Sequence, residues 1–118
     1  MPGAVYRGQS AEPAGVWKDG KLLENDGVGI VLAKRGAEYF PGRSSTPAWR
    51  VRDGVVYRGS SSEPHCRLGR EGVYRGNSSE LLYRTRGDGL LAGSTLAVRG
   101  AGLTLEELAL SALVLLGA

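Results

Sequence analysis

The chain has 118 residues, of which 42% are apolar, and a formal net charge of +3. This length fits one domain with its own core, and the apolar content argues against a disordered chain. One cysteine excludes an internal disulfide, and one cysteine with one histidine disfavours a self-contained metal site. We therefore expect no metal or other cofactor. The 19 glycines and 5 prolines disfavour a helical bundle.

The charge permits an anionic partner without predicting one. Twelve of the fifteen cationic residues are arginines, whose planar guanidinium groups suit anions. Basic and aromatic residues are nevertheless too sparse to predict nucleic-acid binding. The first residues, Met1-Pro2-Gly3-Ala4, have neither the basic nor the apolar region of a secretory signal. This favours a cytoplasmic protein and leaves export by other routes open.

The organising feature of the sequence is a repeat. The tetrapeptide Val-Tyr-Arg-Gly occurs at residues 5–8, 56–59 and 73–76. The last two copies start 17 residues apart, and the first two start 51 residues apart, which is three times 17. A period of this length is typical of repeat architectures, and it predicts further copies starting at residues 22, 39 and 90.

Comparing one position at a time supports these additional copies. The second position is apolar or aromatic in all six units: Tyr6, Leu23, Phe40, Tyr57, Tyr74 and Leu91. The fourth position is glycine in five units: Gly8, Gly42, Gly59, Gly76 and Gly93. The remaining unit, the second in the chain, has Asn25 at this position, and asparagine tolerates a positive φ better than most residues. We therefore expect a left-handed residue at this position of every unit.

Each unit contains two chain reversals. Asp19-Gly20 and Asp53-Gly54 lie between alternating apolar and polar residues, which is a strong hairpin signal. Longer turns follow at 69–72 and 86–89, and the other connection has the form Gly-x-Ser, often followed by proline. A single hairpin of this size is marginal in water. Residues 1–103 are therefore predicted to form an all-β domain, a closed pseudo-symmetric array of about five β-hairpins.

A different pattern begins at residue 104. Thr104 and Glu107 have the spacing of a capping box, and the residues after Glu107 are apolar nearly all round, up to Gly117. Residues 104–118 are predicted to form a C-terminal helix that is buried in a core, packed between subunits or placed on a lipid surface. We favour burial or self-association over the membrane. The leucines expected to serve self-association are Leu105, Leu108, Leu113 and Leu116.

The repeated Tyr-x-Gly-x-Ser unit resembles a short-repeat domain of bacterial proteins, the four-fold β-flower domain. Tyr57–Pro64 and Tyr74–Arg84 carry the match, with weaker copies at Tyr6–Pro13 and Phe40–Arg50. The resemblance covers about residues 4–100. It implies pseudo-symmetric β-hairpins around a central axis, and it implies no enzymatic activity.

Few residues have the chemistry of a catalytic site. His65 and Cys66 are adjacent, so in one strand they would point to opposite faces and would not act as a couple. Cys66 stands at the repeat position of Trp49 and Tyr83, which predicts a buried thiol. The sequence shows neither a P-loop nor a nucleophile motif. We therefore predict that the protein is not an enzyme.

Tyrosines followed by arginines are the better functional lead. The pairs recur at one repeat position: Tyr6 and Arg7, Tyr57 and Arg58, Tyr74 and Arg75. Symmetry would place them round one face, where they would bind a glycan, a nucleotide or an acidic protein surface. The alternative is that tyrosine packs in the core and arginine pairs with a glutamate of the neighbouring unit.

The sequence therefore favours a non-enzymatic module for protein interaction or self-assembly, whose partner is itself or another protein. Carbohydrate or cell-surface binding through the Tyr/Arg ring is the alternative. Hydrolysis by carboxylates that recur with the repeat is least favoured. Those carboxylates are Glu12, Glu63 and Glu80, which we expect to bond loop amides or arginines.

Overall fold

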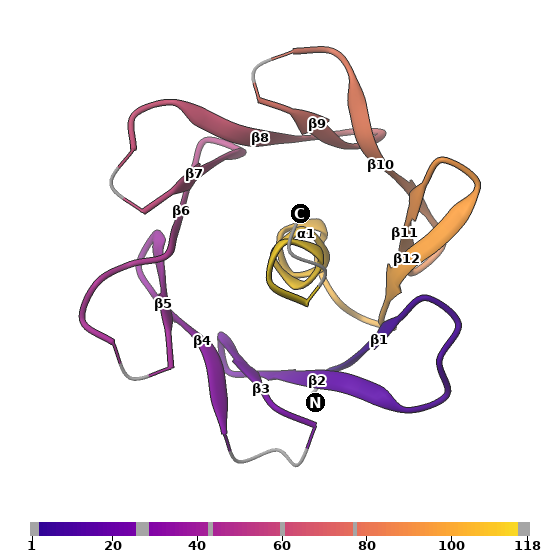
Figure 1. Cartoon of the computed structure of the whole chain (residues 1–118), viewed down its shortest axis with the longest axis horizontal. Helices are drawn as coiled ribbons and strands as arrows, with labels where there is room; N and C mark the ends of the chain where they lie inside the picture. The colour runs from indigo at the N-terminus through magenta and orange to yellow at the C-terminus, as the bar shows by residue number, and fades with distance from the viewer. Residues whose placement is uncertain (1–2, 26–28, 43, 60, 77, 116–118) are drawn as a thin grey trace.

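The computed structural model describes residues 3–25, 29–42, 44–59, 61–76 and 78–115. Within these ranges, twelve short strands form a closed antiparallel barrel around one helix (Figure 1). The strands are β1 (Gly3–Arg7), β2 (Pro13–Lys18), β3 (Lys21–Leu23), β4 (Ile30–Arg35), β5 (Glu38–Pro41), β6 (Trp49–Arg52), β7 (Val55–Arg58), β8 (Pro64–Gly69), β9 (Gly72–Arg75), β10 (Leu81–Arg86), β11 (Gly89–Ala92) and β12 (Thr95–Arg99). The helix is α1 (Leu105–Leu115).

Each strand pairs with its neighbours in chain order, and the barrel closes where β1 meets β12. Short turns join five of the pairs: β2–β3, β4–β5, β6–β7, β8–β9 and β10–β11. The two ends of the barrel domain supply the remaining pair, with Tyr6 opposite Arg99. The predicted closed array of hairpins is confirmed, and a sixth strand pair completes it.

The first position of the repeat forms the inner wall of the barrel. Its six residues are at most 1% exposed: Val5, Leu22, Tyr39, Val56, Val73 and Leu90. Because successive side chains of a strand alternate between faces, the following tyrosines lie on the outer face. These tyrosines, Tyr6, Tyr57 and Tyr74, are half-buried. The first position of the 17-residue repeat therefore faces inward, and the second position faces outward.

The turns largely have the predicted geometry. Asp19 and Gly20 have φ angles of 51° and 77°, and Asp53 and Gly54 have 53° and 77°, as a two-residue type I′ hairpin turn requires. The glycines at the fourth repeat position also have positive φ, between 51° and 64°. The prediction for Asn25 is wrong, since its φ is not positive. The backbone pairing of β3 with β4 continues there instead, because the amide of residue 24 donates to the carbonyl of residue 29 at 2.7 Å.

Each hairpin turn is also tied to the next hairpin. The carbonyls of residues 20, 37, 54 and 71 accept hydrogen bonds from the amides of residues 34, 51, 68 and 85, at 2.7–2.9 Å. Both sets of residues are spaced by the 17-residue period. These bonds fix the position of each hairpin relative to its neighbour.

Helix α1 passes through the middle of the barrel (Figure 1). Its six successive residues from Leu108 to Leu113 are buried. The capping box is confirmed, because the Thr104 amide donates to Glu107 Oε1 at 2.9 Å and the Glu107 amide donates to Thr104 Oγ1 at 3.1 Å. Of the three locations considered for the helix, the structure has the first, the core of its own chain.

Two of the four leucines predicted for self-association are buried inside this chain's own barrel. Leu108 and Leu113 are 5% and 4% exposed, and Leu105 is half-buried. Leu116 lies outside the described residues, as does the expected stop at Gly117. A second copy is therefore not needed to cover Leu108 and Leu113, which removes the reason for predicting self-association through them. In the described part of the chain, no helix is long and apolar enough to cross a bilayer.

Candidate functional site

The outward tyrosines are covered by arginines from the neighbouring strand. Three pairs share this geometry, with guanidinium-to-ring-centroid distances of 5.0, 4.2 and 4.2 Å: Arg50–Tyr57, Arg67–Tyr74 and Arg99–Tyr6. In each pair, the two residues are directly opposite in the strand ladder. Such stacking of a cation on a ring contributes about 0.5–1 kcal/mol at exposed sites. We call these the Tyr–Arg pairs.

The same arginines hold the Gly-x-Ser connections that follow β1, β7 and β9. Their Nη2 atoms donate to serine carbonyls at 2.6, 3.0 and 2.8 Å: Arg50 to Ser61, Arg67 to Ser78 and Arg99 to Ser10. These connections and the one after β5, here called the perimeter loops, are also fastened internally. In each, a serine Oγ accepts from the amide two residues later, at 3.0–3.2 Å: Ser10 from Glu12, Ser44 from Thr46, Ser61 from Glu63 and Ser78 from Glu80.

The structure separates each predicted tyrosine from the arginine that follows it. Tyr6, Tyr57 and Tyr74 face outward, whereas the following residues, Arg7, Arg58 and Arg75, belong to the opposite face and are exposed at the strand ends. Of these, Arg58 lies 5.6 Å from the ring centroid of the buried Trp49. Arg75 pairs with Glu80 of its own unit at 3.6 Å. Within the described ranges, one of these three arginines thus pairs with a carboxylate, and that carboxylate belongs to the same unit.

Sequence reasoning missed the arginines that do contact the tyrosines. The signal was available, because a two-residue turn places residues at equal distances on either side opposite each other. Counting outward from Asp53-Gly54 pairs Arg50 with Tyr57. The same count across the following hairpin pairs Arg67 with Tyr74.

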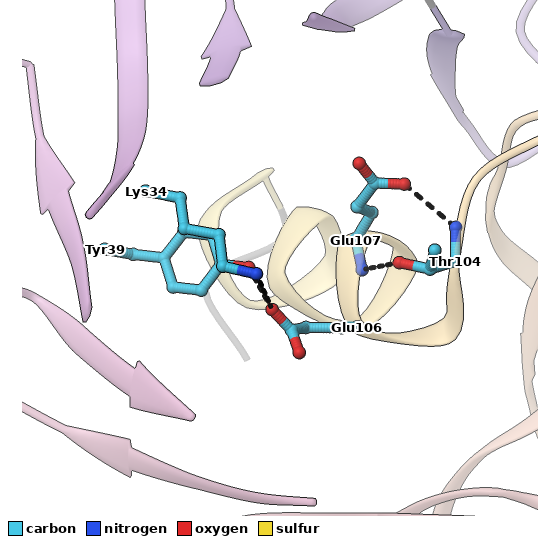
Figure 2. A network of polar contacts seen from close by, with 5 residues as sticks. All are labelled: Lys34, Tyr39, Thr104, Glu106 and Glu107. Carbon is cyan, nitrogen blue, oxygen red and sulfur yellow. Dashed lines mark hydrogen bonds and ion pairs between the residues drawn. The ribbon is translucent and has the colours of Figure 1, made fainter. Parts of the chain in front are cut away.

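A second polar cluster lies at the N-terminal end of α1 (Figure 2). The Tyr39 hydroxyl donates to Glu106 Oε2, and Lys34 Nζ lies 3.4 Å from the same oxygen. Burial, the hydrogen bond to Glu106 and the charges of Glu106 and Glu107 all raise the pKa of Tyr39 above its ordinary value. The phenol therefore remains a protonated donor. The sequence signal was tyrosine at the repeat position where the other units have valine or leucine.

A buried hydrogen bond joins the helix to the barrel beside this cluster. Trp17 Nε1 donates to Ser111 Oγ at 2.8 Å, and Ser111 Oγ donates to the Glu107 carbonyl at 2.7 Å. Ser111 is fully buried, and the Trp17 ring meets the Tyr39 ring edge-on at 6.3 Å. The single polar residue within the apolar part of the helix thus has a structural partner in β2.

Two small pockets flank this end of the helix. One, of about 270 Å³, is bordered by Lys34, Tyr39 and Glu106, and the other, of about 310 Å³, by Asp19 and the linker before the helix. Among the described residues, no buried side-chain nitrogen or oxygen lacks a hydrogen-bond partner. The cluster therefore uses its polar groups to hold the helix. The described residues also contain no group of three or more His, Cys, Asp or Glu side chains placed to hold a metal ion.

Cys66 is fully buried, as its repeat position predicted. Burial raises the pKa of its thiol to about 11, so the thiol is protonated at neutral pH and is a poor nucleophile. Its neighbour His65 packs against the Trp49 ring at 4.9 Å.

Comparisons with protein-family models, with curated proteins and with solved structures find no match to this chain.

Proposed function

We propose that this protein is a non-enzymatic structural module that binds a protein partner, another copy or a different protein, through its perimeter loops. The observation that carries the proposal is the repetition of one fastened loop around the barrel. The loops project outward from the strands (Figure 1), and all four share the serine-to-amide hydrogen bond. The helix meanwhile fills the middle of the barrel, so the perimeter is the repeated surface that stays accessible.

The fastened loops suit binding for two reasons. Their internal hydrogen bonds fix their shape before a partner arrives, which lowers the ordering cost of association. Three of them also present an exposed carboxylate at the same place: Glu12, Glu63 and Glu80. Several copies of one acidic loop on a rigid body favour multivalent contact with a partner that carries basic groups.

Carbohydrate binding through a Tyr/Arg ring is the weaker proposal. Sugar rings pack against open aromatic faces, and in this protein each of the three tyrosines already has a guanidinium group over its ring. The stacked arginines are further engaged by loop carbonyls. A glycan would have to displace these contacts.

Site-specific photo-crosslinking tests the proposal. A photoreactive residue replaces one exposed loop residue at a time, at Gln9, Ser62 or Ser79. As the control it replaces the exposed Arg52, at the end of β6 beside a hairpin turn. In the native host we expect a discrete adduct from the loop positions, whose mass distinguishes a second copy from another protein, and none from position 52. Changing Glu63 and Glu80 to glutamine should weaken that adduct. Adducts absent from all three loops, or equally strong at position 52, would refute the proposal.

A further inference from the structure

Two departures from the repeat meet between the hairpins β8–β9 and β10–β11. The first is Arg84, which stands one period after Arg67 and two periods after Arg50. The residue opposite Arg84 is Leu91, so the tyrosine of the Tyr–Arg pairs is missing. Arg84 is exposed, whereas Arg50 and Arg67 are half-buried, and no residue of the described ranges bonds its guanidinium group.

The second departure is Arg70 in the turn between β8 and β9. The equivalent residue is Asp19 in the first hairpin turn and Asp53 in the third. A cation therefore stands where these two turns have an anion and the turns at Gly36 and Gly87 have glycine. Arg70 is exposed, and its side chain forms no ion pair within the part of the chain that the structure describes.

These two arginines line one groove of about 370 Å³, together with Glu71 and Thr85. The backbone beneath the groove is fixed, because the Glu71 carbonyl accepts from the Thr85 amide at 2.9 Å and from Thr85 Oγ1 at 3.2 Å. One guanidinium group comes from a hairpin turn and the other from the neighbouring strand. Two cations against the single carboxylate of Glu71 leave the groove with a net positive charge.

We infer that this groove binds a phosphate-type oxyanion, either free phosphate or a phosphate monoester. Planar guanidinium groups bind phosphate oxygens through paired, charge-assisted hydrogen bonds, and two of them on a fixed backbone can hold one anion from two sides. Neither arginine must leave another partner in the described structure to do so. The site uses the hairpin turn and β10, so it does not depend on the proposed role of the perimeter loops.

Titration of the full-length protein with inorganic phosphate, followed by amide NMR at constant ionic strength, tests the inference. We expect saturable shifts centred on residues 70, 71, 84 and 85, with a dissociation constant in the millimolar range, which corresponds to about −4 kcal/mol. Arg84→Gln should weaken binding about ten-fold, or about 1.4 kcal/mol, because one of the two guanidinium groups is lost. Arg70→Asp, which introduces the residue of the first and third hairpin turns, should abolish binding.

Two matched variants separate this site from general charge attraction. Arg86→Gln removes an exposed cation of the same hairpin that does not line the groove, and binding should be unchanged. Glu71→Gln removes the opposing carboxylate, and binding should tighten. Tighter binding of phosphoserine than of inorganic phosphate would identify a monoester as the ligand, and equal binding would identify the free ion. Shifts that do not saturate, or an Arg86→Gln variant as weak as Arg84→Gln, would overturn the inference.

Discussion

Replacing Ser111 with alanine tests the central position of α1. The Ser111 hydroxyl accepts the hydrogen bond of Trp17 Nε1, and both side chains are buried. Alanine would leave the indole N–H buried without an acceptor, at a cost of about 1–3 kcal/mol. Its better helix propensity offsets about 0.5 kcal/mol of this. We therefore expect the free energy of unfolding to fall by about 0.5–2.5 kcal/mol.

Urea unfolding followed by circular dichroism measures this difference, and the melting temperature should fall by about 2–10 °C. Hydrogen exchange of the Trp17 indole provides a local readout, because the N–H should exchange faster once its acceptor is gone. Ser62→Ala is the matched control. This serine is exposed in a perimeter loop, and its replacement should change stability by less than about 0.5 kcal/mol.

A double-mutant cycle decides whether the loss comes from this hydrogen bond. Trp17→Phe is combined with Ser111→Ala, and the two changes should show a coupling of about 1 kcal/mol, since the residues are in direct contact. A Ser111→Ala protein as stable as the wild type, together with a coupling of zero, would show that α1 does not lie against β2 inside the barrel.

Three further predictions concern buried or strained residues. Stability should fall as the pH rises above about 10, because folding raises the pKa of Tyr39: its contribution is complete below the unfolded pKa and is lost as the pH rises through the folded one. Urea unfolding against pH should show a steeper dependence in the wild type than in Tyr39→Phe, in which burial still raises the pKa values of Cys66 and Tyr83. Cys66 is fully buried, and burial raises the pKa of its thiol to about 11, so it should react with a thiol reagent at pH 8 only after unfolding. Labelling of the folded protein as fast as that of the urea-unfolded protein would contradict this. Gly72→Ala should cost about 3–5 kcal/mol in urea unfolding, because φ is 151° and the new Cβ would lie 2.0 Å from the Tyr83 carbonyl oxygen. Gly36→Ala, with nothing within 4 Å and a φ of 62°, should cost only about 1–2 kcal/mol.

The architecture of the barrel could largely be predicted from the sequence, because the units repeat the same turn and strand patterns. Asp-Gly turns specify hairpins, and a glycine with positive φ begins each of the four perimeter loops. The position of the core was less accessible. Conspicuous aromatic residues such as Tyr57 attract attention, but the preceding Val56 is the buried one. Alternation along the strand predicts that Val56 and Tyr57 lie on opposite faces. Only the closed barrel shows which of these faces is inside.

The helix and its contacts were the part that the sequence left open. An amphipathic helix shows which side it buries, whereas α1 is apolar nearly all round and gives no such direction. Whether a barrel has room for a helix depends on how many strands close it, which no single unit encodes. The bond from Tyr39 to Glu106 joins residues 67 positions apart, so neither residue alone predicts it.

The pairing of β1 with β12 has a consequence for biosynthesis. During synthesis, β1 keeps one unpaired edge until residues 95–99 have been made, and the helix emerges later still. A nascent chain interrupted before residue 105 therefore has an apolar inner wall with nothing to cover it, and open strand edges are prone to aggregation. Translation of residues 105–115 is the step that covers this apolar wall.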